Sequence, residues 1–301
     1  MRIVITGATG FVGHRLVERL KSRGHALRAW VRSPASAART LGADVELIDA
    51  SGGGAAMQAA IDDADAIVNL AGEPVIGRRW SAAQKQALRA SRIGVTDLIV
   101  DAIAAAPRPR VLVSTSAVGY YGDTGAREVD EDSAPGNDFL AALTIDWEAA
   151  ALRAERHQTR VCLVRIGLVL GRDGGVLGKL LPPFRLGLGG PIGDGKQYFP
   201  WVHIDDLIGM QVAALEREDL HGPLLAVAPG IVTNREFGAA LGRALHRPAV
   251  LRVPAFALRL ALGESASALL NGQRAVPRRT QALGYEFQFP ELEPALADLL
   301  G

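Results

Sequence analysis

Cysteine is almost absent from this chain of 301 residues, because Cys162 is the only one and no disulfide can form within the chain. It lies in the apolar run VCLVRI, where a buried thiol is expected. We therefore expect a reducing compartment and a cytoplasmic location. The six histidines are scattered and none pairs with cysteine or another histidine at metal-ligand spacing, so we predict no metal site.

An excess of charge of either sign is also missing. The chain has 33 basic and 32 acidic residues, a net charge of +1, so we expect neither nucleic acid nor an anionic membrane as a partner. No run approaches the roughly 20 uninterrupted apolar residues of a membrane span. With 49% hydrophobic residues the chain is rich enough in apolar side chains for one large core or a core with a smaller satellite.

Strand-like and helix-like segments alternate over the first half of the chain. The predicted strands are 2–6, 26–31, 45–48, 66–70, 110–115 and 160–166, and the longer predicted helices are 11–23, 81–105 and 139–156. Parallel strands require a covering crossover helix, and short connections of this kind supply one. The sequence therefore predicts an α/β fold with a Rossmann-type doubly wound parallel sheet.

This alternation stops after residue 167, where 171–195 become rich in glycine and proline. A helix at 204–216 and a strand at 224–228 then resume it. We predict a nucleotide-binding domain over 1–166, to which 203–230 return. Segments 167–202 and 231–301 are expected to form a smaller, interleaved C-terminal α/β substrate lobe and cap.

The glycine-rich turn after the first strand carries the first functional signal. Gly7, Gly10 and Gly13 form G-x-x-G-x-x-G between a strand and a helix. Glycine lets a phosphate approach the backbone N–H groups and the positive dipole end at the helix N-terminus. We therefore favour a nucleotide site over a purely structural turn.

The residues at the end of the second strand favour NADP over NAD. NAD-binding chains of this design carry an acidic residue there for the ribose hydroxyls, but residues 24–43 contain none. Arg32 and Ser33 stand in its place, and a guanidinium can bind the 2′-phosphate of NADP. The alternative is that Arg32 is only a solvated strand end. Asp49, after the third strand, is a candidate for the adenine edge.

Several motifs resemble the extended short-chain dehydrogenase/reductases over roughly residues 1–230. The motifs are TGATGFVG (6–13), NLAG (69–72), STS (114–116) followed by YG (121–122), RIG (165–167) and WVHIDD (201–206). RWS (79–81), SRI (91–93), DWE (146–148) and GGPIG (189–193) are similar to an atypical, nucleoside-diphosphate-sugar epimerase-like branch, also called cell-division-inhibitor-like. Residues 249–298, with VPAF (253–256) and GQR (272–274), resemble its C-terminal domain of unknown function.

The resemblance implies NADP as the cofactor and assigns site residues. Beyond the glycines, Arg32, Ser33 and Asp49, the implied cofactor-binding residues are Thr9, Phe11, Val12, Asn69, Leu70, Ala71, Gly72, Ser114, Thr115 and Gly167. Ser116 matches the family's catalytic hydroxyl. The family's Tyr-x-x-x-Lys pair is missing, because alignment on Glu148 puts Leu140 and Thr144 at those positions. Leu140 cannot donate a proton to a carbonyl.

Two tyrosines shortly after Ser116 are candidates to replace the missing proton donor. Tyr120 or Tyr121 is a candidate proton donor, and of the two we choose Tyr121. The favoured alternative is that Tyr121 with Gly122 simply shapes the loop. A phenol with a pKa near 10 needs a cationic neighbour. Lys179 and Lys196 are the two candidates for it.

Two charged segments have competing interpretations. The stretch 78–92 holds arginines and a lysine without an acid, typical of a solvated helix face, although it suits a phosphate-bearing substrate or an acidic partner. Glu73 points toward the same sheet edge and is a candidate for meeting substrate. His203 with Asp205 and Asp206 suggests a dyad, but helix capping is the simpler account.

Together these features predict an NADP(H)-binding atypical short-chain dehydrogenase/reductase. We expect an oxidoreductase or epimerase acting on a small polar substrate between the two lobes, in a monomer or homodimer. The alternative is a catalytically silent NADP(H)-binding regulator that acts through a protein partner.

Overall fold

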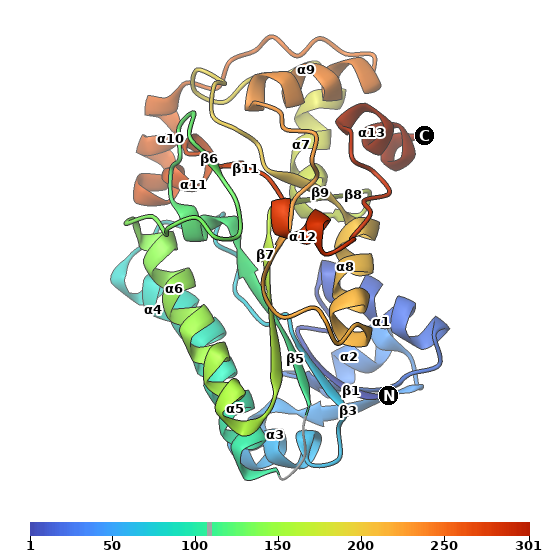
Figure 1. The fold of residues 1–301 in the computed structure, drawn as a ribbon. Helices are drawn as coiled ribbons and strands as arrows, with labels where there is room; N and C mark the ends of the chain where they lie inside the picture. Colours follow the sequence, from blue (N-terminus) through green and yellow to red (C-terminus); the bar gives the residue numbers. More distant parts are fainter. Residues whose placement is uncertain (107–109) are drawn as a thin grey trace.

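A parallel sheet forms the centre of the protein in the computed structural model, which describes residues 1–106 and 110–301 (Figure 1). Over these residues the sheet has seven strands in the order β10-β7-β5-β4-β1-β2-β3, and every neighbouring pair is parallel. The strands are β1 (Arg2–Thr6), β2 (Ala26–Val31), β3 (Val45–Asp49), β4 (Ala66–Asn69), β5 (Val111–Ala117), β7 (Arg160–Ile166) and β10 (Gly222–Ala226). The predicted fold class is confirmed, and the strand order reverses between β1 and β4, where such sheets bind ligands.

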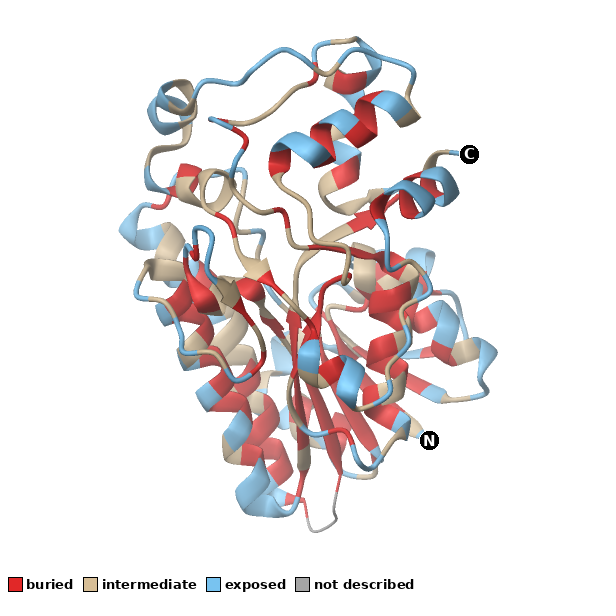
Figure 2. Cartoon of the chain, turned by 45° about the horizontal axis from the view of Figure 1, so that its top comes forward, coloured by how far each residue is buried: buried red, intermediate tan, exposed pale blue. Residues whose placement is uncertain are grey.

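Helices cover the two faces of this sheet. One face packs on α1 (Phe11–Ser22), α2 (Pro34–Leu41) and α8 (Ile204–Glu216), and the other on α3 (Gly53–Ile61), α5 (Val95–Ala105) and α6 (Phe139–Leu152). Because side chains alternate along a strand, Ile3 and Ile5 of β1 belong to one core and Val4 to the other. The strands are buried and the outer helix surfaces are exposed (Figure 2).

The predicted helix over 81–105 is interrupted. Ser81 caps α4 (Ala82–Arg89) by accepting the Gln84 N–H at 3.2 Å, and a π-helical turn, Ala90–Gly94, then precedes α5. Such turns insert an extra residue and change the direction of the side chains around it. Likewise, the predicted helix over 139–156 ends as α6 at Leu152 and continues as a 3-10 turn, Arg153–His157.

The second lobe lies beyond the carboxyl ends of the sheet strands (Figure 1). It contains two small parallel sheets, β8 (Leu168–Gly171) with β9 (Trp201–His203) and β6 (Glu128–Val129) with β11 (Arg274–Ala275). Its helices are α7 (Gly175–Arg185), α9 (Asn234–Ala244), α10 (Ala255–Leu262), α11 (Ser267–Leu270) and α13 (Leu292–Leu300), whereas α12 (Arg278–Ala282) packs beside the edge strand β10 of the central sheet. Short 3-10 turns lie at Ala50–Gly52, Val118–Tyr121 and Gly263–Ala266. In the described part of the chain, no helix has the length and apolarity to span a membrane.

Candidate functional site

The glycine turn between β1 and α1 leaves no room for side chains. A Cβ on Gly13 would lie 2.2 Å from the Gly7 carbonyl oxygen, and Gly7 itself adopts a left-handed φ of 69°. Gly10 precedes α1 without a side-chain cap, and the first turn of α1 has no acidic residue. The first N–H groups of a helix lack intrahelical partners, so this turn suits an anion.

The ring of Phe11 faces the second lobe, so only the backbone of this residue is left for its predicted role at the glycine turn. A Cβ on Gly171 or Gly174 would lie 2.4 Å from that ring. The glycine-rich segment that follows β8 therefore packs on the first residue of α1. This contact ties the second lobe to the turn, which sequence alone did not indicate.

Arg32 and Ser33, the residues predicted to bind the 2′-phosphate, lie just before a second helix, α2. The Arg32 side chain is 87% exposed and its ion pair with Glu73 measures 3.3 Å. Ser33 is the N-cap residue of α2, yet its hydroxyl makes no capping hydrogen bond and the first turn has no acid. Arg32 and Ser33 are thus available to a phosphate. Asp49 accepts the Ser51 N–H at 2.8 Å, and this hydrogen bond lowers the pKa of Asp49.

Hydrogen bonds between buried side chains hold the end of β4 in place. Asn69 is buried, accepts a hydrogen bond from the Thr6 hydroxyl at 2.7 Å and donates to the Thr96 hydroxyl at 2.9 Å. Thr115 donates to the Asn69 carbonyl at 2.7 Å. Ser114 is buried as well, and its hydroxyl has no hydrogen-bond partner among the described residues. The side chains of Asn69 and Ser114 therefore face the protein interior, and their predicted cofactor role stays a prediction.

A cavity of about 410 Å³ begins at the carboxyl ends of β4, β5 and β7 and extends under the second lobe. The predicted site residues Leu70, Ala71, Gly72, Thr115, Ser116 and Gly167 line it. Most of the remaining lining is apolar, including Val75, Leu140, Leu143, Trp147, Ile166, Leu168, Val176, Leu180 and Phe199. The expectation of a small polar substrate did not anticipate this lining, because the apolar side chains come from segments far apart in sequence.

Ser116 belongs to a buried hydrogen-bond network behind the cavity. Its hydroxyl donates to Glu148, whose two carboxylate oxygens accept from Arg165 at 2.8 Å each. Arg165 also donates to the Tyr121 hydroxyl at 2.8 Å. Burial alone would lower the pKa of Arg165, but the hydrogen bonds that it donates to Glu148 and the nearby negative groups raise it, so the guanidinium stays charged.

Tyr121 faces this network and does not line the cavity. It is 1% exposed, and burial raises the pKa of its phenol. Its cationic neighbour is Arg165, while Lys179 and Lys196 are exposed residues of the second lobe. This position favours the interpretation that Tyr121 shapes the loop. An arginine inside the apolar strand 160–166 was the available sequence signal for the network.

Leu140 and Thr144 both line the cavity, on the first two turns of α6. The Thr144 hydroxyl donates to the Leu140 carbonyl at 2.7 Å, so its proton is committed within the helix. Neither side chain can act as a general acid near neutral pH. The cavity wall that would carry a Tyr and a Lys therefore carries no titratable group at these two positions.

The basic stretch over 78–92 binds other parts of the chain. Arg79 donates to the carbonyl oxygens of Leu260 and Ala261, Lys85 pairs with Glu264 at 2.7 Å, and Arg89 pairs with Asp146. These contacts dock the C-terminal cap and α6 on α4. Arg79 and Arg89 are exposed, in agreement with the predicted solvated face, and the acidic groups and carbonyls that the three residues bind belong to this chain. Arg92 differs from them, because it lines the cavity.

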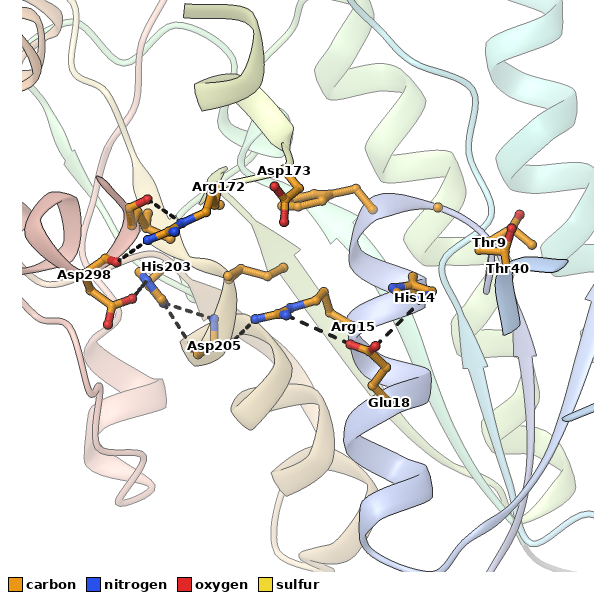
Figure 3. Close-up of a pocket in the computed structure, with 15 residues that line it drawn as sticks. Thr9, His14, Arg15, Glu18, Thr40, Arg172, Asp173, His203, Asp205 and Asp298 are labelled. Atoms are coloured by element: carbon orange, nitrogen blue, oxygen red, sulfur yellow. Dashed lines mark hydrogen bonds and ion pairs between the residues drawn. The ribbon is translucent and has the colours of Figure 1, made fainter. Parts of the chain in front are cut away.

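His203 lies in a groove between α1, α8 and α13, which Figure 3 shows. Its Nδ1 accepts the Asp205 N–H at 3.1 Å, so His203 caps α8, as the simpler interpretation predicted. A neutral ring that accepts at Nδ1 carries its proton on Nε2. Nε2 faces Asp298 of α13 at 3.3 Å. His203, Asp205 and Asp298 link α8 to α13, and their ligand atoms lie within 4.8 Å of one another, close enough to ligate a metal ion, which the sequence analysis did not predict. Asp206 accepts the N–H groups of Gln288 and Phe289.

Comparison with known proteins agrees with this architecture. Residues 3–227 match the NAD dependent epimerase/dehydratase family, and residues 253–299 match the domain of unknown function DUF1731. The epimerase family protein SDR39U1 of Mus musculus is 43% identical over 305 residues, which cover 100% of both chains. The chloroplastic SDR39U1 homolog of Arabidopsis thaliana is 42% identical over 307 residues, covering 100% of this chain and 87% of that protein.

A crystal structure of human epimerase family protein SDR39U1 (isoform2) with NADPH superimposes with a TM-score of 0.90 at 41% sequence identity, covering 100% of this chain and 99% of that one. The match extends through both lobes, including the C-terminal cap. This chain therefore belongs to the NAD dependent epimerase/dehydratase family, in a branch that carries a C-terminal DUF1731 domain.

Proposed function

We propose that this protein binds NADP(H) along the carboxyl edge of its sheet and binds a small ligand in the adjoining cavity. The observation that carries the proposal is the continuity of the two sites, since Leu70–Gly72 and Thr115–Ser116 lie at the strand ends and also line the cavity. The human relative crystallised with NADPH supports the choice of cofactor. NADPH supplies a hydride when it is bound.

Three groups of this chain fit the cofactor's anionic parts. The start of α1 offers uncapped N–H groups beside the close-packed Gly7 and Gly13. Arg32 and Ser33 offer a guanidinium and an uncommitted hydroxyl at the start of α2. A carboxylate at this position would repel a 2′-phosphate, whereas Arg32 attracts it, so NADPH is preferred over NADH.

The Arg32→Glu variant tests this preference. We expect NADPH affinity to fall about tenfold or more while NADH affinity changes little, because only NADPH carries the phosphate. Isothermal titration of both cofactors measures the ratio. Arg39→Glu, an exposed charge reversal on α2, the helix that follows Arg32, is the matched control. If the Arg32 variant leaves the NADPH-to-NADH ratio at the value of the unchanged protein, the 2′-phosphate assignment is wrong.

For the ligand we propose hydride exchange with a largely apolar carbonyl or enone compound. The cavity lining supports an apolar ligand, and Ser116 is among the polar residues that line it. Because the Ser116 proton goes to Glu148, this hydroxyl accepts a hydrogen bond from the alcohol form of the ligand and does not donate one to the carbonyl form. The proton that completes a reduction then comes from water.

The regulatory alternative rests on Leu140 and Thr144, which leave the cavity without the family's acid. Absorbance at 340 nm, followed with NADPH and a panel of apolar aldehydes, ketones and enones, separates the two. Turnover of any panel member supports the oxidoreductase. Ligand binding to the NADPH complex without any oxidation supports the regulator.

A further inference from the structure

Arg92 is a cation enclosed at the edge of a mostly apolar cavity. It lies in the π-helical turn Ala90–Gly94, and its guanidinium lies over the ring of Trp147, 5.4 Å from the ring centroid. A Cβ on Gly72 would lie 3.1 Å from the guanidinium carbon, so Gly72 leaves the room that this side chain occupies. Burial lowers the pKa of Arg92 to about 10, which keeps it charged near neutral pH.

The charge of Arg92 has no counter-ion in contact. Its Nη2 donates to the Glu73 carbonyl at 2.9 Å, and its Nη1 lies 3.4 Å from the Leu88 carbonyl and the Ser91 hydroxyl. Within residues 1–106 and 110–301, no carboxylate comes within ion-pair distance of it, and the Glu73 carboxylate pairs with Arg32 instead. A guanidinium has five N–H donors, so donors remain for a ligand.

The rest of the lining is poor in charge. Among the described residues that line the cavity, Arg92 is the only Lys, Arg or His, and Asp138 is the only acid. One Asp138 oxygen accepts the Ala141 N–H at 2.9 Å, at the start of α6. A buried charge is costly unless an opposite charge compensates it, so an anionic group of the bound ligand would be most stable at Arg92.

We propose that the cavity binds a ligand with an apolar body and one carboxylate, and that Arg92 is the residue that binds the carboxylate. The proposal rests on the proposed function, because it names the ligand class of the same cavity. A planar guanidinium matches a planar carboxylate through two parallel hydrogen bonds. A phosphate dianion would need further cations, which the described lining lacks.

The experiment compares carboxylates with their uncharged amides. Benzoate, 3-phenylpropanoate and octanoate, each with its primary amide, are titrated into the NADPH-saturated protein and followed calorimetrically. The variants are Arg92→Leu, which removes the charge, and Arg92→Lys, which keeps the charge but not the planar guanidinium with its two parallel N–H donors. Arg89→Leu, on an exposed ion pair three residues earlier, is the matched control. NADPH affinity of each variant reports on its folding and on the cofactor site.

We expect at least one carboxylate to bind about tenfold or more tightly than its amide, as for a charge-assisted hydrogen-bonded pair. Arg92→Leu should abolish that difference and leave amide and NADPH affinities unchanged, Arg92→Lys should keep part of it, and Arg89→Leu should keep all of it. The proposal is overturned if no carboxylate exceeds its amide, including when none binds.

It is also overturned if Arg92→Leu weakens NADPH instead, because Arg92 would then bind the cofactor pyrophosphate and the proposed function would stand. Failure of the unchanged protein to bind NADPH would instead refute the proposed function itself.

Discussion

Glu148→Gln removes the negative charge that neutralises Arg165 inside the protein. Arg165 and Glu148 are only 4% and 6% exposed, so water cannot replace the lost carboxylate. Breaking a buried pair by removing one partner typically costs about 3–5 kcal/mol. We expect the free energy of unfolding to fall by this amount. For 301 residues with an unfolding entropy of about 2.1 cal/mol/K per residue, the melting temperature falls by roughly 5–8 °C.

Differential scanning calorimetry measures this loss, with circular dichroism at 25 °C to verify that the variant is folded. Asp146→Asn is the control on the same helix, because the Asp146–Arg89 pair is nearly half exposed. Such exposed pairs contribute below about 1 kcal/mol. The double variant Glu148→Leu with Arg165→Met should recover much of the stability, since apolar residues of similar size remove both buried charges together.

A melting temperature of Glu148→Gln within about 1 °C of the unchanged protein would contradict this reasoning. It would mean that Arg165 reaches water or finds another partner. A double variant that is less stable than Glu148→Gln would contradict the second step, because the cost would then come from lost packing rather than from the unpaired cation.

Two further predictions concern the turn and the link between α8 and α13. Gly13→Ala should abolish NADPH binding and lower the free energy of unfolding by about 1–3 kcal/mol, because the added Cβ meets backbone atoms 2.2–2.9 Å away. A Cβ on Gly94 would meet nothing within 4 Å, so the control Gly94→Ala should change neither quantity. Titration and scanning calorimetry measure the two effects. Burial lowers the pKa of His203 below its ordinary 6.5, so the unfolded chain binds more protons and stability should fall as pH drops below about 6.5. His203→Asn keeps a capping residue and should lack this component in urea unfolding at pH 5 and 7; an identical loss in both proteins would refute the assignment.

The half of the fold that forms the seven-stranded sheet was predictable because its signals are local. The strands at 2–6, 26–31 and 160–166 have the predicted bounds, since apolar runs and glycine spacing determine them within a few residues. The motifs also predicted the family, through their resemblance to the extended short-chain dehydrogenase/reductases. The interruption of the predicted helix over 81–105 was not visible, because a π-helical turn changes only one hydrogen-bond register in a pattern that stays helical.

The cavity could not be predicted in the same way. Its wall combines Leu140 of α6, Ile166 of β7 and Phe199 of the second lobe, and no local period relates these residues. The partners of Arg165 were hidden for the same reason, since Tyr121 and Glu148 lie 44 and 17 residues away in sequence. Sequence patterns indicate which residues are buried, whereas the direction of each side chain depends on tertiary packing.

The same network gives Ser116 a structural role. Ser116 donates to Glu148, and Glu148 with Tyr121 holds Arg165, so the serine helps to fix the carboxylate that neutralises a buried cation. Val118, Gly119 and Gly122 of the neighbouring loop form part of the cavity wall. Loss of the network should therefore disturb ligand binding in the cavity more than NADPH binding at the glycine turn. The turn follows β1, whereas the network joins β5, α6 and β7.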